Sequence, residues 1–372
     1  MIKNKSHPIL IVIILLMGSS LNKKVYASEL GNPGDPIHLT VGIQPYFIPV
    51  WSGVVLKHKE FWKKYLPVGS TIVFESNLQG AVIVDEMLAN KQQIGYLGDM
   101  PALTVTDKKE FADVRLVGVT GSSPQSCDII FVRKDAPDFK STKETTDWLN
   151  GKVFASFHSS CGDRFAQAVF KKIGIEPLQY LNQTLKVISD NFQNGLLDAA
   201  VVWEPMATQL EMKKIARRVA SGVDFGERDT AYVVMRNDLM EKRPDVAKGW
   251  MEAELDAQLF LADPVNADEI INIVKAETTD FDYETLWTAL YGEWKVSKGG
   301  SLDKLTLNYS FTPDMVDHAQ QVYSFLHSIK QVNTITLRNN AIDSRLAEAI
   351  LEERGLSSPV GVVKAKVLLD KK

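Results

Sequence analysis

The stretch from Lys152 to Gly174 constrains the fold of this chain more than any other. An apolar, β-prone run reaches Phe157 and is broken by the polar turn His158-Ser159-Ser160-Cys161-Gly162. Apolar residues then recur at helical spacing, and Gly174 stands where a helix would stop. We therefore predict a strand, a tight turn and a helix, a unit from which α/β folds are built.

The turn in this stretch offers a place for an anion. Ser159 or Ser160 can cap the helix, and the free backbone N–H groups and the helix dipole there favour negative charge. An ordinary capped helix with nothing bound fits the same residues, because strand–turn–helix units are common. The stretch alone does not decide between the two interpretations.

The first 27 residues have the pattern of a signal peptide. Lys3 and Lys5 precede an apolar core from Ile9 to Met17, and Val25-Tyr26-Ala27 forms a small-residue cleavage pattern. The apolar run is short for a membrane span, and no cysteine follows it as a lipid-attachment site. We expect an exported, soluble protein of the periplasm.

The charge of the chain argues against nucleic acid as a partner. The formal net charge is −4, and the signal peptide carries four lysines and no acid, so its removal leaves −8. Phosphate backbones require a basic footprint, which the mature chain lacks. Its length is sufficient for two compact domains.

Only two cysteines occur, Cys127 and Cys161. Export to an oxidising compartment allows a disulfide between them. Sequence cannot give the geometry of the two residues, so it does not decide whether the disulfide forms. Without any CxxC pair, a structural zinc site is not expected, and no metal or other cofactor is required.

The pattern of strands and helices predicts a chain that crosses between two domains twice. Short strands and helices alternate from Ile37 to Thr120, which we interpret as an α/β domain with a largely parallel sheet. In the second domain we expect a strand at Leu185–Ser189 and a short helix at Asn191–Leu197. The expected boundaries are residues 37–125 and 226–330 for the first domain, 126–225 for the second, and 331–372 for a C-terminal extension.

Polar and aromatic residues follow the ends of several expected strands. They are Gln44 to Phe47, Gly98 to Met100, His158 to Cys161 and Trp203 to Pro205. In open α/β sheets, ligands lie beyond the carboxyl ends of strands. Two such sheets facing each other form a cleft that can close by hinge motion.

Several of these segments together carry a family resemblance. They are Tyr96 to Leu103, Val132 to Asp135 with Leu149 to Val153, His158 to Arg164, and Gly195 to Pro205. From about Ile37 to Gly292, the chain resembles the exported solute-binding proteins of ABC importers for aliphatic sulfonates, taurine and nitrate. The resemblance implies a two-domain, two-crossing periplasmic-binding-protein fold, a monomer, and an ABC permease of the inner membrane as partner.

The resemblance also implies a ligand site in the interdomain cleft. Ser159 and Ser160 would hold an oxyanion, aromatic residues would cover the apolar part of the ligand, and two glutamines would orient it. The full candidate set is Gln44, Tyr46, Phe47, Gln79, Gly80, Gly98, Asp99, Gln125, Cys127, Asp128, His158, Ser159, Ser160, Cys161, Arg164, Trp203 and Glu204.

Three acids in this set, Asp99, Asp128 and Glu204, would repel an anionic ligand. Bringing like charges together in a dry cleft costs free energy. Either they point away from the ligand, or the ligand also carries an amine, as taurine does. Trp203 fits a core position as well as a ligand contact. Arg164, in the first turn of its helix, needs a charge partner, which is either a nearby acid or the ligand.

We expect a carrier of a small organic anion or zwitterion and no enzymatic activity. The alternative is a cysteine-dependent C–S lyase resembling the desulfinases of related fold. Cys161 at a helix N-terminus, with His158 three residues away, is suited to a nucleophile. An exported sensor domain would use the same cleft, but it would need a signalling partner or a fused module.

Overall fold

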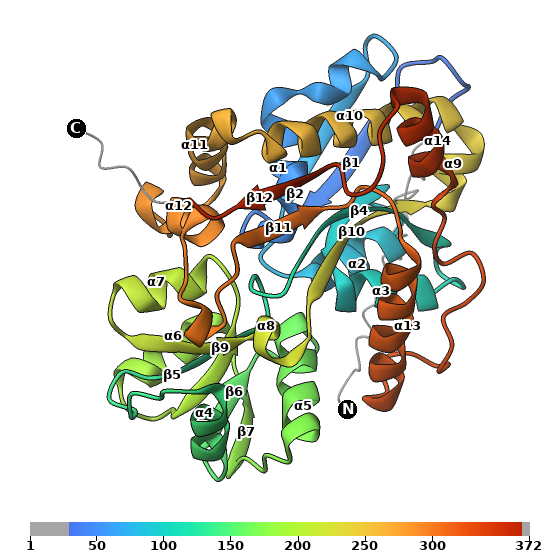
Figure 1. Cartoon of the computed structure of the whole chain (residues 1–372). Coiled ribbons are helices and arrows are strands. Elements are labelled where there is room, and N and C mark those ends of the chain that lie inside the picture. Colours follow the sequence, from blue (N-terminus) through green and yellow to red (C-terminus); the bar gives the residue numbers. More distant parts are fainter. Residues whose placement is uncertain (1–29, 367–372) are drawn as a thin grey trace, which may run out of the picture.

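The computed structural model describes residues 30–366 and shows two lobes, each built on a β-sheet flanked by helices (Figure 1). The expected signal peptide, residues 1–27, lies outside the described residues. Within residues 30–366, no helix combines the length and the apolar character needed to cross a membrane.

The larger sheet has seven strands in the order β12-β11-β4-β10-β3-β1-β2. Strand β1 is parallel to β2 and β3, whereas β10 is antiparallel to β3 and β4. The prediction of a largely parallel sheet is therefore wrong, because a strand returning from the second lobe inserts between β3 and β4. The strands are β1 (His38–Ile43), β2 (Thr71–Ser76), β3 (Ile94–Gly98), β4 (Val114–Ser123), β10 (Asp229–Arg236), β11 (Asp303–Leu307) and β12 (Gly361–Lys364).

The smaller sheet has five strands in the order β7-β6-β8-β5-β9. The chain enters it between β4 and β5 and leaves it between β9 and β10, so two crossings connect the lobes, as expected. Its strands are β5 (Ile129–Arg133), β6 (Val153–Ser156), β7 (Gln179–Asn182), β8 (Ala199–Val202) and β9 (Ala216–Ser221).

Helices surround both sheets, and short 3-10 turns occur at residues 48–50, 61–64, 264–266 and 296–298. The α-helices are α1 (Trp51–Lys59), α2 (Gly80–Leu88), α3 (Asp99–Asp107), α4 (Thr142–Leu149), α5 (Cys161–Ile173), α6 (Leu185–Gln193), α7 (Met206–Met212), α8 (Gly222–Phe225), α9 (Asn237–Lys242), α10 (Pro244–Ala262), α11 (Ala267–Glu277), α12 (Tyr283–Tyr291), α13 (Pro313–Ser328) and α14 (Arg345–Arg354).

The strand–turn–helix unit predicted over residues 152–174 is confirmed as β6 followed by α5. The Ser160 hydroxyl caps α5 by accepting a hydrogen bond from the Asp163 N–H at 3.3 Å. Gly174 ends the helix with φ 69°, a left-handed conformation that glycine adopts without steric cost.

The prediction of a strand at Leu185–Ser189 is wrong, because these residues form the first part of helix α6. The Thr184 hydroxyl caps this helix by accepting from the Val187 N–H at 3.4 Å. Ile188 and Phe192, four residues apart, form its buried face. The helix ends at Gln193, so the helix expected at Asn191–Leu197 is also misplaced.

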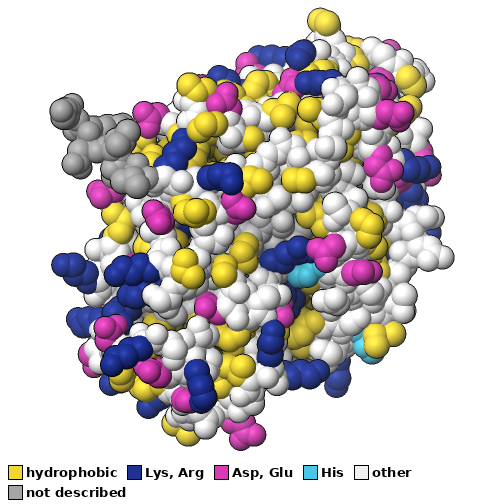
Figure 2. All heavy atoms as spheres, in the orientation of Figure 1, with side chains coloured by type: hydrophobic (Ala, Val, Ile, Leu, Met, Phe, Trp, Pro, Cys, Tyr) yellow, Lys and Arg dark blue, Asp and Glu magenta, His cyan; other side chains and the backbone are white. Residues whose placement is uncertain are grey.

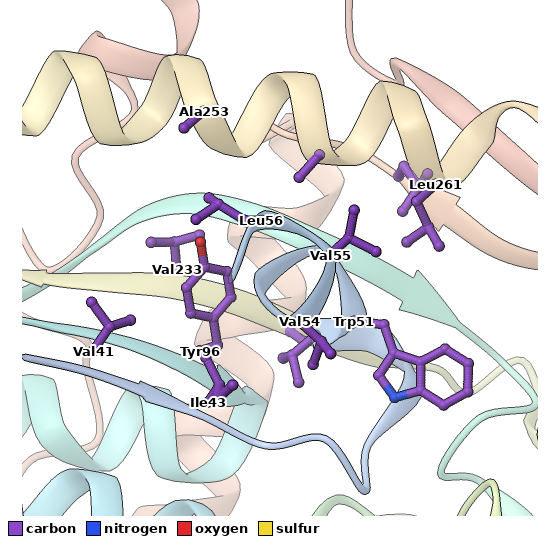
Figure 3. Packing of buried hydrophobic residues seen from close by; sticks show 14 of the residues in the cluster. Val41, Ile43, Trp51, Val54, Val55, Leu56, Tyr96, Val233, Ala253 and Leu261 are labelled. Atoms are coloured by element: carbon purple, nitrogen blue, oxygen red, sulfur yellow. The ribbon is translucent and has the colours of Figure 1, made fainter. Parts of the chain in front are cut away.

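Helix α1 lies between α10 and the larger sheet and fixes the loop that follows β1 (Figure 3). Val54, Val55 and Leu56 are fully buried, and their burial stabilises the fold by about 1.5–3 kcal/mol per side chain. The buried Trp51 indole donates to the Pro45 carbonyl at 2.8 Å. Trp51 therefore packs in the core, and it anchors the loop that brings Gln44 and Phe47 to the site.

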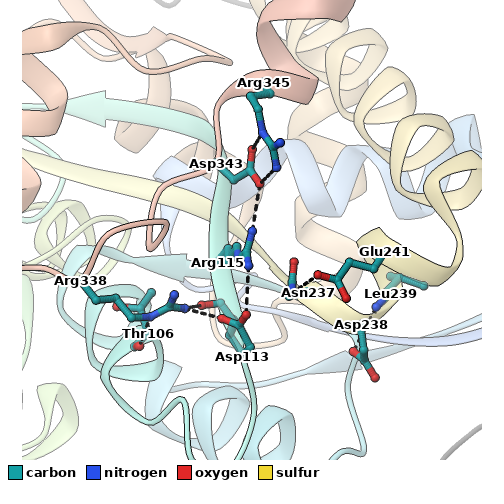
Figure 4. A network of polar contacts seen from close by, with 11 residues as sticks. Thr106, Asp113, Arg115, Asn237, Asp238, Leu239, Glu241, Arg338, Asp343 and Arg345 are labelled. Atoms are coloured by element: carbon teal, nitrogen blue, oxygen red, sulfur yellow. Dashed lines mark hydrogen bonds and ion pairs between the residues drawn. The ribbon is translucent and has the colours of Figure 1, made fainter.

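The segment after residue 331 packs on the larger sheet. Strand β12 pairs with β11, and the Asp343 N–H donates to the Leu116 carbonyl at 2.8 Å. Around that point, Arg115 pairs with both Asp113 and Asp343 (Figure 4). The segment expected as a C-terminal extension thus completes the edge of this sheet.

Candidate ligand-binding cleft

A cavity of about 340 Å³ lies where the carboxyl ends of strands from both sheets meet. Residues following β1 and β3 line it from the larger sheet, and residues following β6 and β8 line it from the smaller one. Its lining is Gln44, Phe47, Leu78, Gln79, Gly80, Ala81, Val84, Asp85, Gly98, Asp99, Pro101, Thr104, Phe157, His158, Ser159, Ser160, Cys161, Trp203, Leu326 and Gln331.

Gln44 shapes the side of the cleft that belongs to the larger sheet. With its amide oriented to satisfy both neighbours, its oxygen accepts from the Gly80 N–H at 3.0 Å and its nitrogen donates to the Tyr96 carbonyl at 3.2 Å. A Cβ at position 80 would lie 2.5 Å from the Pro101 side chain, so helix α2 approaches the cleft through a glycine. The Gln44 side chain therefore binds the backbone of Gly80 and Tyr96.

The turn after β6 shapes the opposite side. Ser159 has φ 60°, and its N–H donates to Asp163 Oδ2 at 2.9 Å. The Ser160 hydroxyl donates to the Phe157 carbonyl at 2.5 Å while it caps α5. The Ser160 side chain is thus occupied within the turn, and the backbone is held in one conformation.

The start of helix α5 presents free hydrogen-bond donors beside the cavity. The N–H groups of Cys161 and Gly162 are the first two of the helix and have no acceptor within residues 30–366. Free N–H groups at a helix N-terminus, together with the helix dipole, favour an anion.

Three aromatic side chains give the cavity an apolar wall. Phe157 and Trp203 meet edge to face with ring centroids 6.3 Å apart, and Phe47 faces them from the loop after β1. Trp203 is half-buried and lines the cavity, so it is more than a core residue. Tyr46 lies outside the lining and packs on Phe281, with ring centroids 5.8 Å apart.

Cys127 and Cys161 form a disulfide, with their Cα atoms 6.1 Å apart. Cys127 lies two residues before β5, at the first crossing, whereas Cys161 is the first residue of α5 and lines the cavity. Both cysteines of the chain are bonded, so Cys161 offers no thiolate. The nucleophile required by the lyase alternative is therefore missing from this structure.

Arg164 sits behind the cleft beside four acids, Asp99, Asp128, Glu227 and Asp229. Its guanidinium donates to Asp99 Oδ2 at 3.2 Å, to Glu227 Oε2 at 3.0 Å and to the Arg228 carbonyl at 2.6 Å. The Asp128 Oδ2 atom lies 3.8 Å from Arg164 Nη2. Arg164 is buried and does not line the cavity, and its charge partners are acids of the protein.

Burial acts on the carboxyls around Arg164. It raises the pKa of Asp99, an effect that Arg164 opposes, and it raises the pKa of Asp128 and Asp229 well above the usual range. Within the described chain, the carboxyl oxygens of Asp128 and Asp229 have no hydrogen-bond partner. A single arginine thus neutralises the acids behind the cleft only in part.

Two further candidates are used by the scaffold. Glu204 pairs with the buried Arg218 and accepts from the Thr208 N–H at 2.9 Å, which fixes the start of α7. Gln125 donates to the carbonyls of Ser301 and Asp303 at 3.0 and 2.9 Å. The members of the candidate set that do not line the cavity are Tyr46, Gln125, Cys127, Asp128, Arg164 and Glu204.

The cavity also includes residues that the sequence did not single out. Phe157 is adjacent to the predicted turn. Its position at the end of the expected strand was the signal that could have identified it as a lining residue. Leu326 and Gln331 come from the end of α13 and the segment after it, and nothing local in the sequence connects them to the site. Among the lining residues, Asp85 and Asp99 are acidic and no lysine or arginine occurs.

The outer surface shows no comparable specialisation on the face in view. Basic and acidic side chains are interspersed across it (Figure 2).

The model of the NMT1-like family matches residues 37–275, which covers the strands on both sides of the cleft. This chain belongs to the NMT1-like family. Over 200 residues, it is 27% identical to the taurine-binding periplasmic protein of Escherichia coli (strain K12). That match spans 53% of this chain and 59% of the relative, which is less than two thirds of its length.

Solved structures similar to this NMT1-like chain include binding proteins and an enzyme. The alkanesulfonate-binding protein SsuA from Xanthomonas axonopodis pv. citri, bound to MOPS, matches with TM-score 0.65 and 16% identity over 83% of this chain and 99% of that one. The enzyme DszB, in complex with biphenyl-2-sulfinic acid, matches with TM-score 0.64 and 14% identity over 86% of this chain and 100% of that one. These likenesses establish the two-domain periplasmic-binding-protein fold.

Proposed function

We propose that this NMT1-like chain is the exported substrate-binding component of an ABC importer. It captures a small organic anion or zwitterion of the sulfonate or taurine type and delivers it to a permease in the inner membrane. The observation that carries the proposal is the cavity between the two sheets, lined by the strand ends of both. Contacts from both domains give the ligand a higher affinity for the closed state, which is what drives closure.

The charges at the cavity favour a ligand that carries an amine beside its negative group, because Asp85 and Asp99 are in the lining and no lysine or arginine is. Asp99 pairs with Arg164 and Glu204 pairs with Arg218, so the protein itself compensates these two acids, whereas Asp128 lies 3.8 Å from Arg164 and accepts no hydrogen bond within the described residues. The free N–H groups at the start of α5 are placed to hold a sulfonate. Asp85, exposed at the cavity, is suited to an amine, so a zwitterion fits both features.

We propose a carrier and not an enzyme, located in the periplasm after removal of a signal peptide within residues 1–27. The disulfide supports this assignment over the cysteine-dependent lyase, because Cys161 has no free thiol. The likeness to DszB concerns the fold, and a fold by itself does not imply an activity.

The test is thermal unfolding of the mature protein with a panel of ligands. The panel contains taurine, short alkanesulfonates, sulfinates, sulfate, nitrate, and pyrimidine and amine compounds. A ligand at about one hundred times its Kd stabilises the fold by roughly 2.7 kcal/mol, which is visible as a higher melting temperature. Stabilisation by a heterocyclic or cationic compound and by no oxyanion would overturn the proposed ligand class.

A further inference from the structure

A second group of polar side chains lies away from the cavity, where the two lobes meet. It consists of Arg218 on β9, Lys304 on β11 and Trp294 in the loop after α12, and we call it the Arg218 cluster. Arg218 is fully buried and Lys304 is 3% exposed. Because β9 belongs to the smaller sheet and β11 to the larger one, the cluster joins both.

One indole ring faces both cations of the cluster. The Arg218 guanidinium carbon lies 4.2 Å from the centroid of the Trp294 ring and 5.6 Å from that of Phe131. Lys304 Nζ lies 5.6 Å from the centroid of the Trp294 ring. Two buried positive groups are thus gathered around the same aromatic side chain.

The cluster has donors that lack acceptors. Arg218 Nε and Nη1, Lys304 Nζ and Trp294 Nε1 are buried and have no hydrogen-bond partner within residues 30–366. Buried polar atoms are hydrogen-bonded in the great majority of cases, so a concentration of unsatisfied donors indicates a missing acceptor.

The acids beside the cluster pair with only part of Arg218. Glu204 is engaged by Arg218 Nη2 and by the Thr208 N–H. Glu211 Oε2 forms an ion pair with Arg218 Nε at 3.5 Å, and Lys298 acts electrostatically on that same acid. These acids leave Arg218 Nη1, Lys304 Nζ and Trp294 Nε1 without an acceptor in the described chain.

We propose that the Arg218 cluster binds a small inorganic anion of the size of chloride, held by Arg218 Nη1, Lys304 Nζ and Trp294 Nε1. The chemistry is that of a monovalent ion accepting hydrogen bonds from two cations and an indole N–H. Such an ion connects β9 with β11 and so stabilises the junction between the lobes. None of the three residues lines the cavity, so the site is separate from the proposed ligand site.

The electrostatics of Lys304 agree with this geometry. Burial, followed by the nearby Arg218, lowers the pKa of Lys304 to about 7. An anion in contact with Nζ favours the charged amine and offsets both effects.

The direct test uses bromide as the probe. Crystals of the mature protein are soaked in sodium bromide, and anomalous diffraction is recorded at the bromine edge. We expect an anomalous peak within hydrogen-bond distance of Arg218 Nη1 and Lys304 Nζ. An ordered water with no anomalous signal at that position would overturn the proposal.

A second test measures melting temperature in solution. At constant ionic strength, chloride should raise the melting temperature of the mature protein relative to gluconate, and Lys304→Met should abolish the difference. Lys364→Met is the matched control, because Lys364 lies on the neighbouring strand β12 with its side chain 68% exposed, and it should retain the chloride effect.

The wild-type measurements keep the proposal testable if Lys304→Met fails to fold. Equal melting temperatures of the wild type in chloride and gluconate would contradict the site. Neither experiment requires the ligand of the cleft, so its outcome is independent of the proposed transport function.

Discussion

At the scale of single residues, Trp203 has the most direct expected role in the cleft. It follows β8, lines the cavity and contacts Phe157, while the adjacent Glu204 is buried in a pairing with Arg218. Neighbouring residues at one strand end thus point to different environments. The indole contributes apolar area to the ligand site, and the glutamate stabilises the scaffold beneath it.

Trp203→Ala should weaken binding of the ligand found in the panel, because the variant loses the apolar contact that the indole provides. The loss should be roughly 1.5–3 kcal/mol, or about tenfold or more in Kd. Isothermal titration calorimetry measures the change. Trp148→Ala is the matched control, since Trp148 is half-buried on α4, packs on Phe139 and should leave Kd unchanged. Equal affinity of Trp203→Ala and the wild type would remove Trp203 from the site.

Glu254 on α10 gives a prediction on pH. Its carboxylate accepts hydrogen bonds from the Tyr96 hydroxyl and from the Gln258 side chain, each at 2.8 Å. Burial nevertheless raises its pKa from 4.5 to about 7. The folded state therefore binds a proton more tightly than the unfolded state, and the associated stability is complete below pH 4.5 and lost as pH rises through about 7.

Glu254→Gln should remove this part of the pH dependence, which amounts to roughly 3 kcal/mol. Urea unfolding of the wild type and the variant, near pH 5 and near pH 8, measures it. We expect the variant to lose less stability between the two pH values than the wild type does. The same loss in both proteins would show that Glu254 does not titrate in this range.

At the scale of elements, the N-terminus of α5 connects stability with the site. The Ser160 hydroxyl caps the helix, and the first helical residue, Cys161, lines the cavity. Other helices of the same lobe are capped in the same way. Helix α4, for example, is capped by Ser141, whose hydroxyl accepts from the Glu144 N–H at 3.2 Å.

Ser160→Ala should lower the free energy of unfolding by about 1 kcal/mol and also weaken ligand binding, because the donors of α5 lose their fixed position. Ser141→Ala should cost a similar free energy and leave binding unchanged, since α4 does not line the cavity. Denaturant unfolding and calorimetry on both variants separate the two effects. Identical binding losses in the two variants would mean that the cap at Ser160 acts through general stability alone.

At the scale of the whole molecule, Arg164 connects the two lobes. It lies on α5 of the smaller lobe, and its partners are Asp99 at the start of α3 and residues 227 and 228 next to the second crossing. The lobes therefore meet through a buried charge, and the same arginine is the cation nearest to the acids behind the cleft.

Arg164→Met should destabilise the protein by about 3–5 kcal/mol, because Asp99 would remain buried without its cation. Arg345→Met is the comparison: Arg345 also pairs with a buried acid, Asp343, but its own side chain is 82% exposed, so its loss should cost far less stability than that of Arg164. Denaturant unfolding measures both. Equal losses would contradict a special role of the buried pairing.

The sequence by itself determined the elements whose signals are local. The turn at His158–Gly162, the cap at Ser160 and the stop at Gly174 depend on hydrogen bonds between residues a few positions apart, so β6 and α5 could be predicted. Of the candidate residues that line the cavity, Gln79 and Gly80 were implied by the family resemblance, whereas the others follow strand ends, which are readable as polar breaks after apolar runs.

Only the tertiary structure decided which distant groups meet. The antiparallel insertion of β10, the helix at Leu185–Gln193, the partners of Arg164 and the contribution of Leu326 and Gln331 to the cavity depend on packing between segments far apart in the chain. Charge pairing and strand direction leave no local periodicity in the sequence. Their energies arise from burial, which exists only once the two lobes have formed.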